Sequence, residues 1–285
     1  KKLMGYLTQY KIGLLLVVIF AIGSTIFNIA GPKILGKATT EYLSRFGNCI
    51  FACDLKPPVK ENNIIPIAVD ITQENQLKAV FTELQKGHVK LDALINVAGI
   101  FHMDNLLEIQ EERLVKMLEV NLLGAIRVNK IFFPLLREHG KILITSSEVA
   151  PLDPLPFNSV YHITKTALDS YAQALRQEAG LLGYHVITVR PGAFATPLEQ
   201  SSVPSMREMS ESSRYFGGQA ERFAELMRMF TGKPADPVKY AKLIEKILRK
   251  KHPAAVYTIH ANIGLRLLAL LPKNMQVSVV KRLLK

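Results

Sequence analysis

The chain has 285 residues, of which 48% are hydrophobic and 21% charged, and this balance excludes a disordered protein. The formal net charge is +12 at pH 7, but the basic residues are not interleaved with aromatic ones and no nucleic-acid-binding motif is present. We therefore expect no nucleic acid partner. Basic residues gather near both chain ends beside apolar stretches, a pattern that fits an anionic membrane surface. Cys49 and Cys53 lack the second ligand pair of a zinc site, so we expect free thiols in a reducing compartment and no metal.

The first predicted element is apolar. The run Ile12–Ala30 contains no charged residue and is long enough to span a bilayer. Its second part, residues 25–30, lies where the first strand of an α/β domain should begin, and one segment cannot be both. We therefore assign residues 1–23 to a membrane-seeking segment and 25–30 to a strand. A shallow anchor explains the short apolar segment nearly as well as a span, and a cleaved signal peptide explains it less well.

Beyond residue 24, short apolar segments alternate with segments of helical periodicity. Near-continuous apolar strands separated by helices predict an α/β domain, here over residues 24–262, with a parallel sheet covered on both faces. We expect strands over 25–30, 49–53, 64–69, 91–97, 141–146 and 185–189, and helices over 37–45, 73–85, 111–136 and 159–182.

Polar and turn-forming residues follow these strands. In such sheets the chemistry lies at the carboxyl ends of the strands, so these residues are candidates for the functional site. They are Asp54, Asp70, Asn96, Ser147 and Pro191-Gly192.

Tyr161 and Lys165 lie four residues apart, which places them on one face of the helix expected over 159–182. A neighbouring ammonium favours the ionised phenol and lowers its pKa from about 10. Such a tyrosine can exchange a proton with an alcohol near neutral pH. The same spacing is common in ordinary exposed helices. A catalytic role is supported here by Ser147, fourteen residues before Tyr161, and by Asn121.

Five motifs occur together in order and resemble those of the short-chain dehydrogenase/reductase family over roughly residues 24–260. The resemblance implies a Rossmann-type doubly wound parallel sheet. It also implies an NAD(P)-dependent oxidoreductase that interconverts a secondary or lipidic alcohol and its carbonyl by hydride transfer. Residues 252–276 look like those of members that act on steroids, retinoids or other lipidic alcohols. The motifs are Asn-Val-Ala-Gly at 96–99, Asn-Leu-Leu-Gly at 121–124, Thr-Ser-Ser at 145–147, Tyr161-x-x-x-Lys165 and Pro191-Gly192-x-x-x-Thr196.

The resemblance assigns the catalytic roles. Tyr161 would be the general acid/base, Lys165 would lower its pKa and contact the nicotinamide ribose, and Ser147 would polarise the reacting oxygen. Asn121 would hold a water that links Lys165 to solvent. The separation between Ser147 and Tyr161 is one residue longer than is usual in the family, which the proline-rich loop between them could absorb, and Ser146 is the alternative.

The preferred cofactor follows from Asp54. A carboxylate at the end of the second strand accepts hydrogen bonds from a ribose 2′-hydroxyl and repels a 2′-phosphate, so NAD is favoured over NADP. Lys56 and two nearby lysines, Lys33 and Lys37, could still tolerate the phosphate. Asp54 could instead be a turn residue.

The remaining cofactor contacts rest on the resemblance alone. Asp70 would contact the adenine ring, although it could equally cap the following helix. Thr196 would bind the nicotinamide carboxamide, or it could be an ordinary helix cap. Further contacts are implied for Asn96, Ala98, Gly99, Pro191 and Gly192, and for Tyr161 and Lys165.

The glycine-rich turn of the family is not reproduced. Counting back from Asp54 leaves only Gly36 in register, with Gly31 displaced by one position and Ile34 where the second glycine is usual. Glycines let backbone amides approach a pyrophosphate, and a β-branched residue adds bulk there. We expect Gly31-Pro32 to form a replacement turn with weaker dinucleotide binding. The alternative function is a catalytically weak, membrane-associated binding or scaffold protein.

The last part of the chain bears on partners. Residues 197–233 are rich in methionine and phenylalanine and resemble the family's substrate lid, which favours a hydrophobic small-molecule substrate. Residues 263–285 form a basic amphipathic tail that could lie on a membrane or form an oligomer contact. The resemblance also implies a homodimer or homotetramer paired through the helices that carry Asn121 and Tyr161. We expect a membrane-associated protein on the cytoplasmic side.

Overall fold

The computed structural model describes residues 31–61, 63–192, 194, 202–230 and 235–285. The predicted membrane-seeking segment 1–23 and the strand expected over 25–30 lie outside these residues. Among the described helices, none is both long and apolar enough to cross a bilayer. Both cysteines are free, as expected, but their side chains are exposed rather than buried in a strand.

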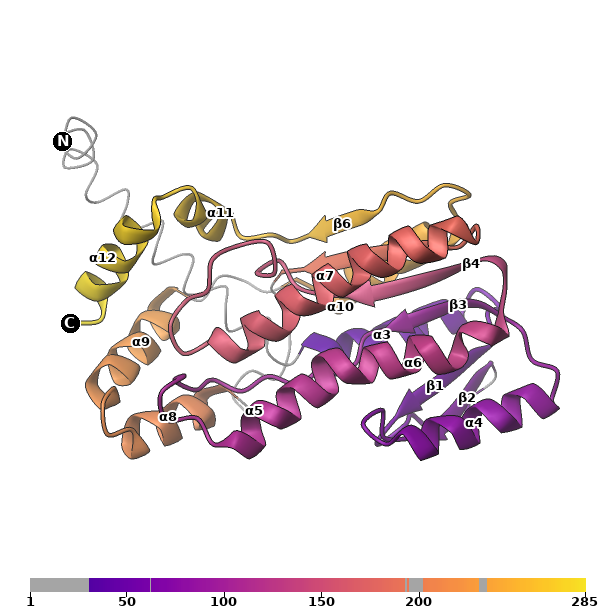
Figure 1. The fold of residues 1–285 in the computed structure, drawn as a ribbon, viewed down its shortest axis with the longest axis horizontal. Coiled ribbons are helices and arrows are strands. Elements are labelled where there is room, and N and C mark those ends of the chain that lie inside the picture. Colours follow the sequence, from indigo (N-terminus) through magenta and orange to yellow (C-terminus); the bar gives the residue numbers. More distant parts are fainter. Residues whose placement is uncertain (1–30, 62, 193, 195–201, 231–234) are drawn as a thin grey trace.

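Every described strand pairs in parallel, as the alternating pattern predicted. β1 pairs with β2 in a two-stranded sheet, and β3, β4, β5 and β6 follow one another in a four-stranded sheet. Parallel pairing brings the carboxyl ends of these strands to one edge, toward α8, α9, α11 and α12 in Figure 1. The strands are β1 (Ile50–Asp54), β2 (Ile64–Ala68), β3 (Leu91–Asn96), β4 (Leu136–Thr145), β5 (His185–Pro191) and β6 (Val256–Ile259).

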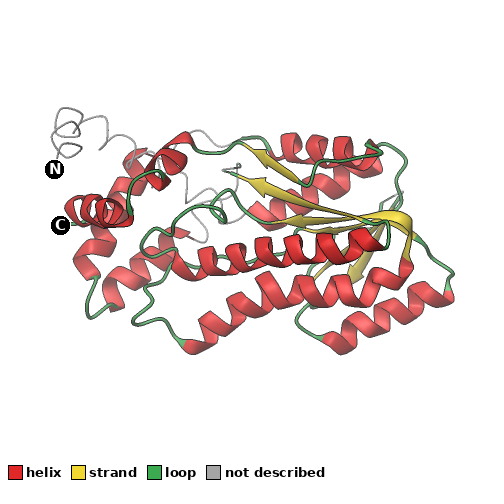
Figure 2. Ribbon diagram, turned by 45° about the horizontal axis from the view of Figure 1, so that its top comes forward, coloured by secondary structure: helices red, strands yellow, loops and turns green. Residues whose placement is uncertain are grey.

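Helices cover both faces of the four-stranded sheet, and alternate residues of each strand point to opposite faces (Figures 1 and 2). On β4, Ile142 and Ile144 pack against α4, α6 and α7, whereas Leu143 packs against α3 and α10. The helices are α3 (Gly31–Ser44), α4 (Glu74–Lys86), α5 (Glu111–Leu118), α6 (Ala125–Phe132), α7 (Ser159–Leu181), α8 (Ser202–Ser212), α9 (Gly217–Phe230), α10 (Pro237–Arg249), α11 (Ile263–Ala269) and α12 (Lys273–Leu283).

The helix α3 corrects the prediction of a turn at Gly31-Pro32. Its helical conformation begins at Gly31, six residues earlier than expected, so Gly31 and Gly36 both lie within the helix. Pro32 suits a first helical turn because its fixed φ matches the helix. Leu35 is 1% exposed and anchors this part of α3 in the core, which explains why the segment is not a loop.

The helix expected over 111–136 is found as one continuous run of helical segments that ends at Leu135, but it is not a regular α-helix throughout. A wider π-helical turn, Glu119–Gly124, separates α5 from α6, and a short 3-10 turn follows at Phe133–Leu135. The side chain of Asn121 bonds to the backbone of Ile100, and a Cβ at Gly124 would lie only 2.6 Å from Ile71 Cδ1. The wide turn thus places Asn121 where it contacts a neighbouring loop, as π-bulges at functional sites often do.

A third apolar core lies beyond the carboxyl ends of the strands. It joins the loop after β4 and the start of α7 to the helices α8 and α9 and to the C-terminal helices α11 and α12. The tail therefore packs on the domain through one side, with Leu265 and Leu268 buried at 4% exposure each. This core contains Tyr161.

Candidate active site

Tyr161 lies in the first turn of α7, the helix that comes after the loop following β4. Its side chain is 2% exposed, and its ring meets that of Phe101 edge to face at 5.0 Å between centroids. The phenol hydrogen-bonds to the side chain of Ser147, which is fully buried. The structure therefore brings together the two hydroxyl groups that the sequence singled out.

The two serines at the end of β4 point to different partners. The Ser147 hydroxyl faces Tyr161 and also accepts a hydrogen bond from the Val149 amide at 3.3 Å. The Ser146 hydroxyl instead donates to the Lys165 carbonyl at 3.2 Å and fixes α7 to the strand. The geometry selects Ser147 over Ser146 as the partner of Tyr161.

Lys165 lies one helical turn beyond Tyr161 and is 1% exposed. Its Nζ donates to the Thr145 carbonyl at 3.2 Å and lies 5.6 Å from the centroid of the Tyr161 ring. Burial lowers the pKa of this ammonium to about 8. The side chain can therefore exchange protons close to neutral pH.

The predicted lowering of the Tyr161 pKa is not found in this structure. Burial raises the pKa of the phenol above its ordinary value, the Ser147 hydrogen bond opposes that rise, and the Glu148 carboxylate adds to it. Desolvation is the largest of these effects because the phenol is almost entirely removed from water. In this state Tyr161 is a protonated hydroxyl.

Asn121 is 1% exposed and bonds to two elements. Its Oδ1 accepts from the Ile100 amide at 2.7 Å, and its Nδ2 donates to the Ile100 carbonyl at 2.8 Å and to Thr164 Oγ1 at 3.1 Å. The side chain thus joins the loop after β3 to α7, next to Lys165. Asn121 therefore lies close to Tyr161 and Lys165, and its hydrogen bonds also fix the backbone at Ile100.

The predicted adenosine-binding residues follow the strands of the separate two-stranded sheet, Asp54 at the end of β1 and Asp70 after β2. Asp54, half-buried, ends β1, and its Oδ1 accepts from the Lys56 amide at 2.8 Å. Asp70 Oδ1 accepts from both the amide and the hydroxyl of Thr72, each at 2.8 Å, in the turn before α4. Asp70 does not cap α4, because the N-cap position is held by Gln73, and its carboxylate instead stabilises the turn that precedes the helix.

The predicted cofactor-binding residues at the end of β3 and in the loop after it differ in burial and in hydrogen bonding. Asn96 Nδ2 donates to Asn129 Oδ1 at 2.8 Å and to the Leu143 carbonyl at 3.3 Å, so this side chain ties β3 to α6 and β4. Ala98 is exposed and Gly99 half-buried in the loop that follows. A Cβ at Gly36 would approach only Val97 Cγ1, at 4.0 Å, so Gly36 is not required by packing.

Pro191 is the last residue of β5 and Gly192 follows it, and both residues are buried. A Cβ at Gly192 would lie 1.9 Å from the His260 carbonyl oxygen, so only glycine fits this backbone approach. The Gly192 amide donates to the Ile259 carbonyl at 2.8 Å, and the Pro191 carbonyl accepts from the Glu148 amide at 3.0 Å. The motif thus closes the loops after β4, β5 and β6 together. Thr196 lies outside the described residues.

Glu148 is the main residue that sequence reasoning missed. It directly follows Ser147, is 4% exposed, and its Oε2 accepts a hydrogen bond from the Asn262 amide. A carboxylate inside the buried run that ends β4 is the signal that could have identified it, since charged side chains are rarely buried without partners. The negative charge of Glu148 raises the pKa of Tyr161.

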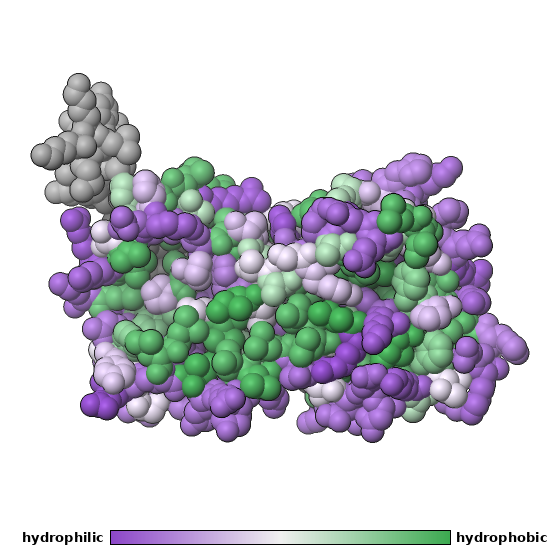
Figure 3. Space-filling view, in the orientation of Figure 1, coloured by the Kyte–Doolittle hydropathy of each residue, from purple (hydrophilic) through white to green (hydrophobic). Residues whose placement is uncertain are grey.

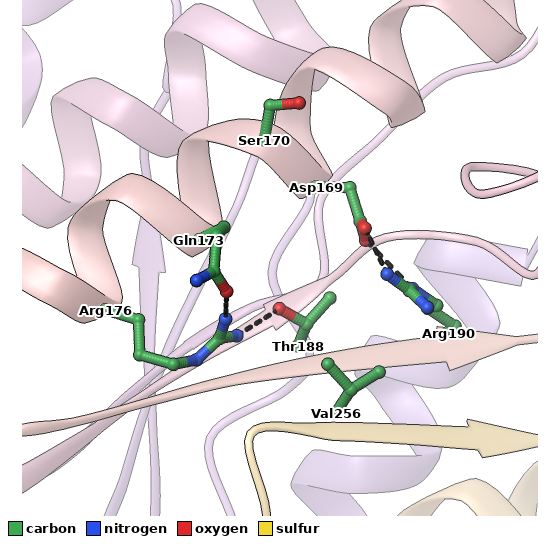
Figure 4. A pocket seen from close by; sticks show the side chains of 7 residues that line it. All are labelled: Asp169, Ser170, Gln173, Arg176, Thr188, Arg190 and Val256. Carbon is green, nitrogen blue, oxygen red and sulfur yellow. Dashed lines mark hydrogen bonds and ion pairs between the residues drawn. The ribbon is translucent and has the colours of Figure 1, made fainter.

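A cavity of about 330 Å³ lies apart from these residues, between α7 and the strands β5 and β6 (Figure 4). Arg190 pairs there with Asp169, and Arg176 bonds to Thr188 and Gln173. Arg176 also donates to the Ala255 carbonyl at 3.0 Å, next to β6. These bonds fasten α7 to β5 and β6, and the cavity contains none of the predicted site residues. Within the described ranges, no acidic, histidine or cysteine cluster could hold a metal ion.

Known proteins share this architecture. An oxidoreductase of Botryotinia fuckeliana, BOA17, is 28% identical over 235 residues, which cover 77% of this chain and 82% of the relative. Estradiol 17-beta-dehydrogenase 2 of Rattus norvegicus is 30% identical over 178 residues, which cover 56% of this chain and 45% of that enzyme. The match thus spans less than half the length of the rat protein.

A short-chain dehydrogenase of Streptomyces avermitilis has the same fold, with a TM-score of 0.67, 22% identity, and coverage of 87% of this chain and 90% of that one. This likeness confirms the predicted Rossmann-type α/β fold. The model of the family described as short chain dehydrogenase matches residues 26–207, which include every predicted catalytic position. The chain therefore belongs to the short-chain dehydrogenase family of oxidoreductases.

Proposed function

We propose that the protein is an NAD(P)-dependent oxidoreductase that interconverts a secondary or lipidic alcohol and its carbonyl, with Tyr161 as the general acid/base. The observation that carries this proposal is the buried contact between the hydroxyl groups of Ser147 and Tyr161, with the ammonium of Lys165 near the same ring. Family membership supports the oxidoreductase class. No observation favours the alternative of a scaffold without catalysis.

Each residue has a role in moving one proton. In the reducing direction the Tyr161 hydroxyl donates its proton to the developing alkoxide, while the Ser147 hydroxyl stabilises the same oxygen by a hydrogen bond. In the oxidising direction Tyr161 accepts the proton. Lys165, whose pKa is about 8, can return a proton to the phenol near neutral pH. We assign Asn121 to ordering the water that would connect Lys165 to solvent.

A nicotinamide dinucleotide would supply or accept the hydride. The chain offers Asp54, half-buried at the end of β1, to hydrogen-bond a ribose hydroxyl, and the N-terminus of α3 to face phosphate groups. A carboxylate at this position repels a 2′-phosphate, so we propose NAD as the preferred form, with NADP as the second choice. Pro191 and Gly192 would lie beside the nicotinamide.

We propose a hydrophobic substrate. Tyr161 belongs to an apolar core that includes Met103, Phe157, Met209 and Phe223, so a substrate that reaches the phenol meets hydrocarbon on several sides. Such surroundings favour a steroid-like or acyl-chain alcohol over a sugar. The name of the rat relative, an estradiol dehydrogenase, agrees with this class.

We also propose that the protein pairs with a second copy through α5, α6 and α7. Apolar side chains gather across this face in Figure 3, where the family-based resemblance predicted the contact. Val115, Leu123 and Ile163 are between 36% and 48% exposed there. Burying such a patch is the usual reason for an oligomer.

The outward side of the tail suits a membrane surface. Ile263, Leu270 and Val277 are at least 65% exposed, and basic residues such as Lys281 flank them. We propose that the protein lies on the cytoplasmic side of a membrane. Co-sedimentation with anionic vesicles should fall when Leu270 and Val277 are replaced by serine. Unchanged co-sedimentation would count against this surface.

The activity itself is tested with purified protein, NAD or NADP, and a panel of steroid, retinoid and acyl-chain alcohols, followed at the absorbance of reduced nicotinamide. We expect turnover of at least one lipidic alcohol, with NAD giving the higher kcat/KM. Calorimetric titration with each dinucleotide is run in parallel. The absence of both turnover and dinucleotide binding at millimolar concentration would overturn the proposal.

A further inference from the structure

The loop between Ser147 and Tyr161 is held on two sides. On the α7 side, Thr166 Oγ1 donates to the Ala150 carbonyl at 3.0 Å, and the ring of His162 hydrogen-bonds to the Leu152 carbonyl. On the other side the loop contacts the C-terminal segment, more than a hundred residues later in the chain. These long-range contacts are unusual for a loop, which ordinarily lies on the surface.

The first contact to the C-terminal segment comes from Glu148. Its carboxylate accepts a hydrogen bond from the backbone amide of Asn262, the residue that caps the start of α11. Because Glu148 directly follows Ser147, this bond fixes the backbone next to the hydroxyl that meets Tyr161. The Asn262 side chain in turn accepts from the Leu265 amide at 3.2 Å and starts the helix.

The second contact comes from Asp153, in the middle of the loop. One carboxylate oxygen pairs with Lys273 Nζ, and the other accepts from Gln276 Nε2 at 2.7 Å. Gln276 is 9% exposed and also donates to the Leu271 carbonyl at 2.8 Å. Asp153 therefore contacts α12 at two residues, and Gln276 links this contact to the backbone that follows α11.

Apolar packing joins the same two segments. Val149 and Leu155 of the loop belong to one core with Leu265 and Leu268 of α11, and that core includes Tyr161. The tail thus contributes to the apolar surroundings of the phenol as well as to the hydrogen bonds around the loop. Its outward apolar residues are on the opposite side.

We propose that the C-terminal helices α11 and α12 hold the loop that carries Ser147 in its reactive position, and that Glu148 and Asp153 are positioning residues for the reaction. The inference rests on the proposed function for its catalytic consequence. A loop one residue longer than usual gains conformational freedom, and contacts at Glu148 and Asp153 remove that freedom. Ser147 is then fixed within hydrogen-bond reach of the phenol.

The test compares Asp153→Ala with Asp92→Ala. The control breaks the exposed ion pair between Asp92 and Arg137, at 3.2 Å, far from the site. We expect Asp153→Ala to lower kcat/KM roughly tenfold, because small displacements of catalytic groups cost large factors in rate. The Kd for NAD(H) should stay within about twofold of the wild-type value, because Asp153 is not among the dinucleotide contacts. Asp153→Asn keeps an oxygen for Gln276 and should recover part of the activity.

Hydrogen–deuterium exchange gives a readout that does not depend on activity. The amides of Ala150 and Leu152 are bonded within the loop, and we expect their exchange to accelerate in Asp153→Ala and not in Asp92→Ala. Accelerated exchange in a protein without dehydrogenase activity would support the positioning role while the proposed function fails. Unchanged exchange over residues 147–158, or kcat/KM equal to that of the Asp92→Ala control, would overturn the inference.

Discussion

The two ends of the predicted site differ in how they are built. Ser147, Tyr161 and Lys165 are each at most 2% exposed and contact one another or the strand beneath them. Asp54 and Asp70 are half-buried and bond chiefly to the turns in which they lie. Proton transfer needs particular side chains at fixed distances, whereas phosphate binding relies on backbone amides. A proton-transfer site can therefore be recognised in a sequence from its residue types, whereas a phosphate-binding site cannot.

A large difference in kcat is expected between alanine variants of the two serines that follow β4. Ser147→Ala removes the hydroxyl that contacts Tyr161, and we expect kcat to fall roughly 10²- to 10³-fold, as for loss of an oxyanion donor. Ser146→Ala, whose hydroxyl donates to the Lys165 carbonyl, should change kcat by less than about tenfold. Steady-state kinetics of both variants decides. Equal losses would contradict the assignment of Ser147.

Alanine variants of two glycines compare the stability of the proton-transfer end of the site with that of the dinucleotide end. Gly192→Ala places a Cβ 1.9 Å from the His260 carbonyl oxygen, and we expect a loss of at least about 2 kcal/mol in the free energy of unfolding. Gly36→Ala meets only Val97 at 4.0 Å inside α3 and should raise stability by about 0.5–1 kcal/mol. Denaturant unfolding measures both. A stable Gly192→Ala variant would show that the loops after β5 and β6 are not in contact.

The buried lysine should make stability depend on pH. Burial lowers the pKa of Lys165 from 10.5 to about 8, so between these values the unfolded chain binds more protons than the folded one. Stability therefore rises with pH in this window, by about 2 kcal/mol from pH 7.5 to 9.5. Lys165→Met has no group to titrate and should lack this rise. Parallel pH dependences of the two free energies would contradict a buried ammonium.

The smallest expected effect lies at the dinucleotide end. Asp54→Ala removes a carboxylate that would hydrogen-bond a ribose hydroxyl, and we expect the Kd for NAD to rise about tenfold while that for NADP changes less. Asp70→Ala breaks the bonds to Thr72 and should mainly lower stability. Calorimetric titration of both variants distinguishes them. A larger loss of NAD affinity in Asp70→Ala would reverse the two roles.

Much of the sheet could be predicted because its strands contain nearly continuous apolar runs. The expected strand 49–53 differs from β1 by one residue at each end, and the helix expected over 159–182 ends one residue beyond α7. Alternation of apolar strands and helices specified parallel pairing before any contact was known. The side chains of Ser147, Tyr161 and Lys165 then followed from their positions at the end of β4 and the start of α7.

The remainder depended on long-range contacts that no local pattern displays. α3 begins at Gly31 because Leu35 is buried, and the helix around Asn121 widens because that side chain bonds to Ile100. The mixture of apolar and basic residues predicts a tail that lies on a membrane or forms an oligomer contact. Its other side packs near Tyr161, which only the fold shows. Glu148 was missed because its partner, Asn262, lies far along the chain.

The central claim is that Tyr161 transfers the proton that accompanies hydride transfer. The most direct test is the single-turnover rate of nicotinamide reduction or oxidation, measured at saturating dinucleotide for the wild-type protein and Tyr161→Phe. We predict a rate roughly 10²- to 10⁴-fold lower in the variant, because a positioned general acid/base contributes a factor of this size. Dinucleotide affinity should stay within about threefold, since binding does not need the phenolic proton. Equal rates in the two proteins would contradict the account.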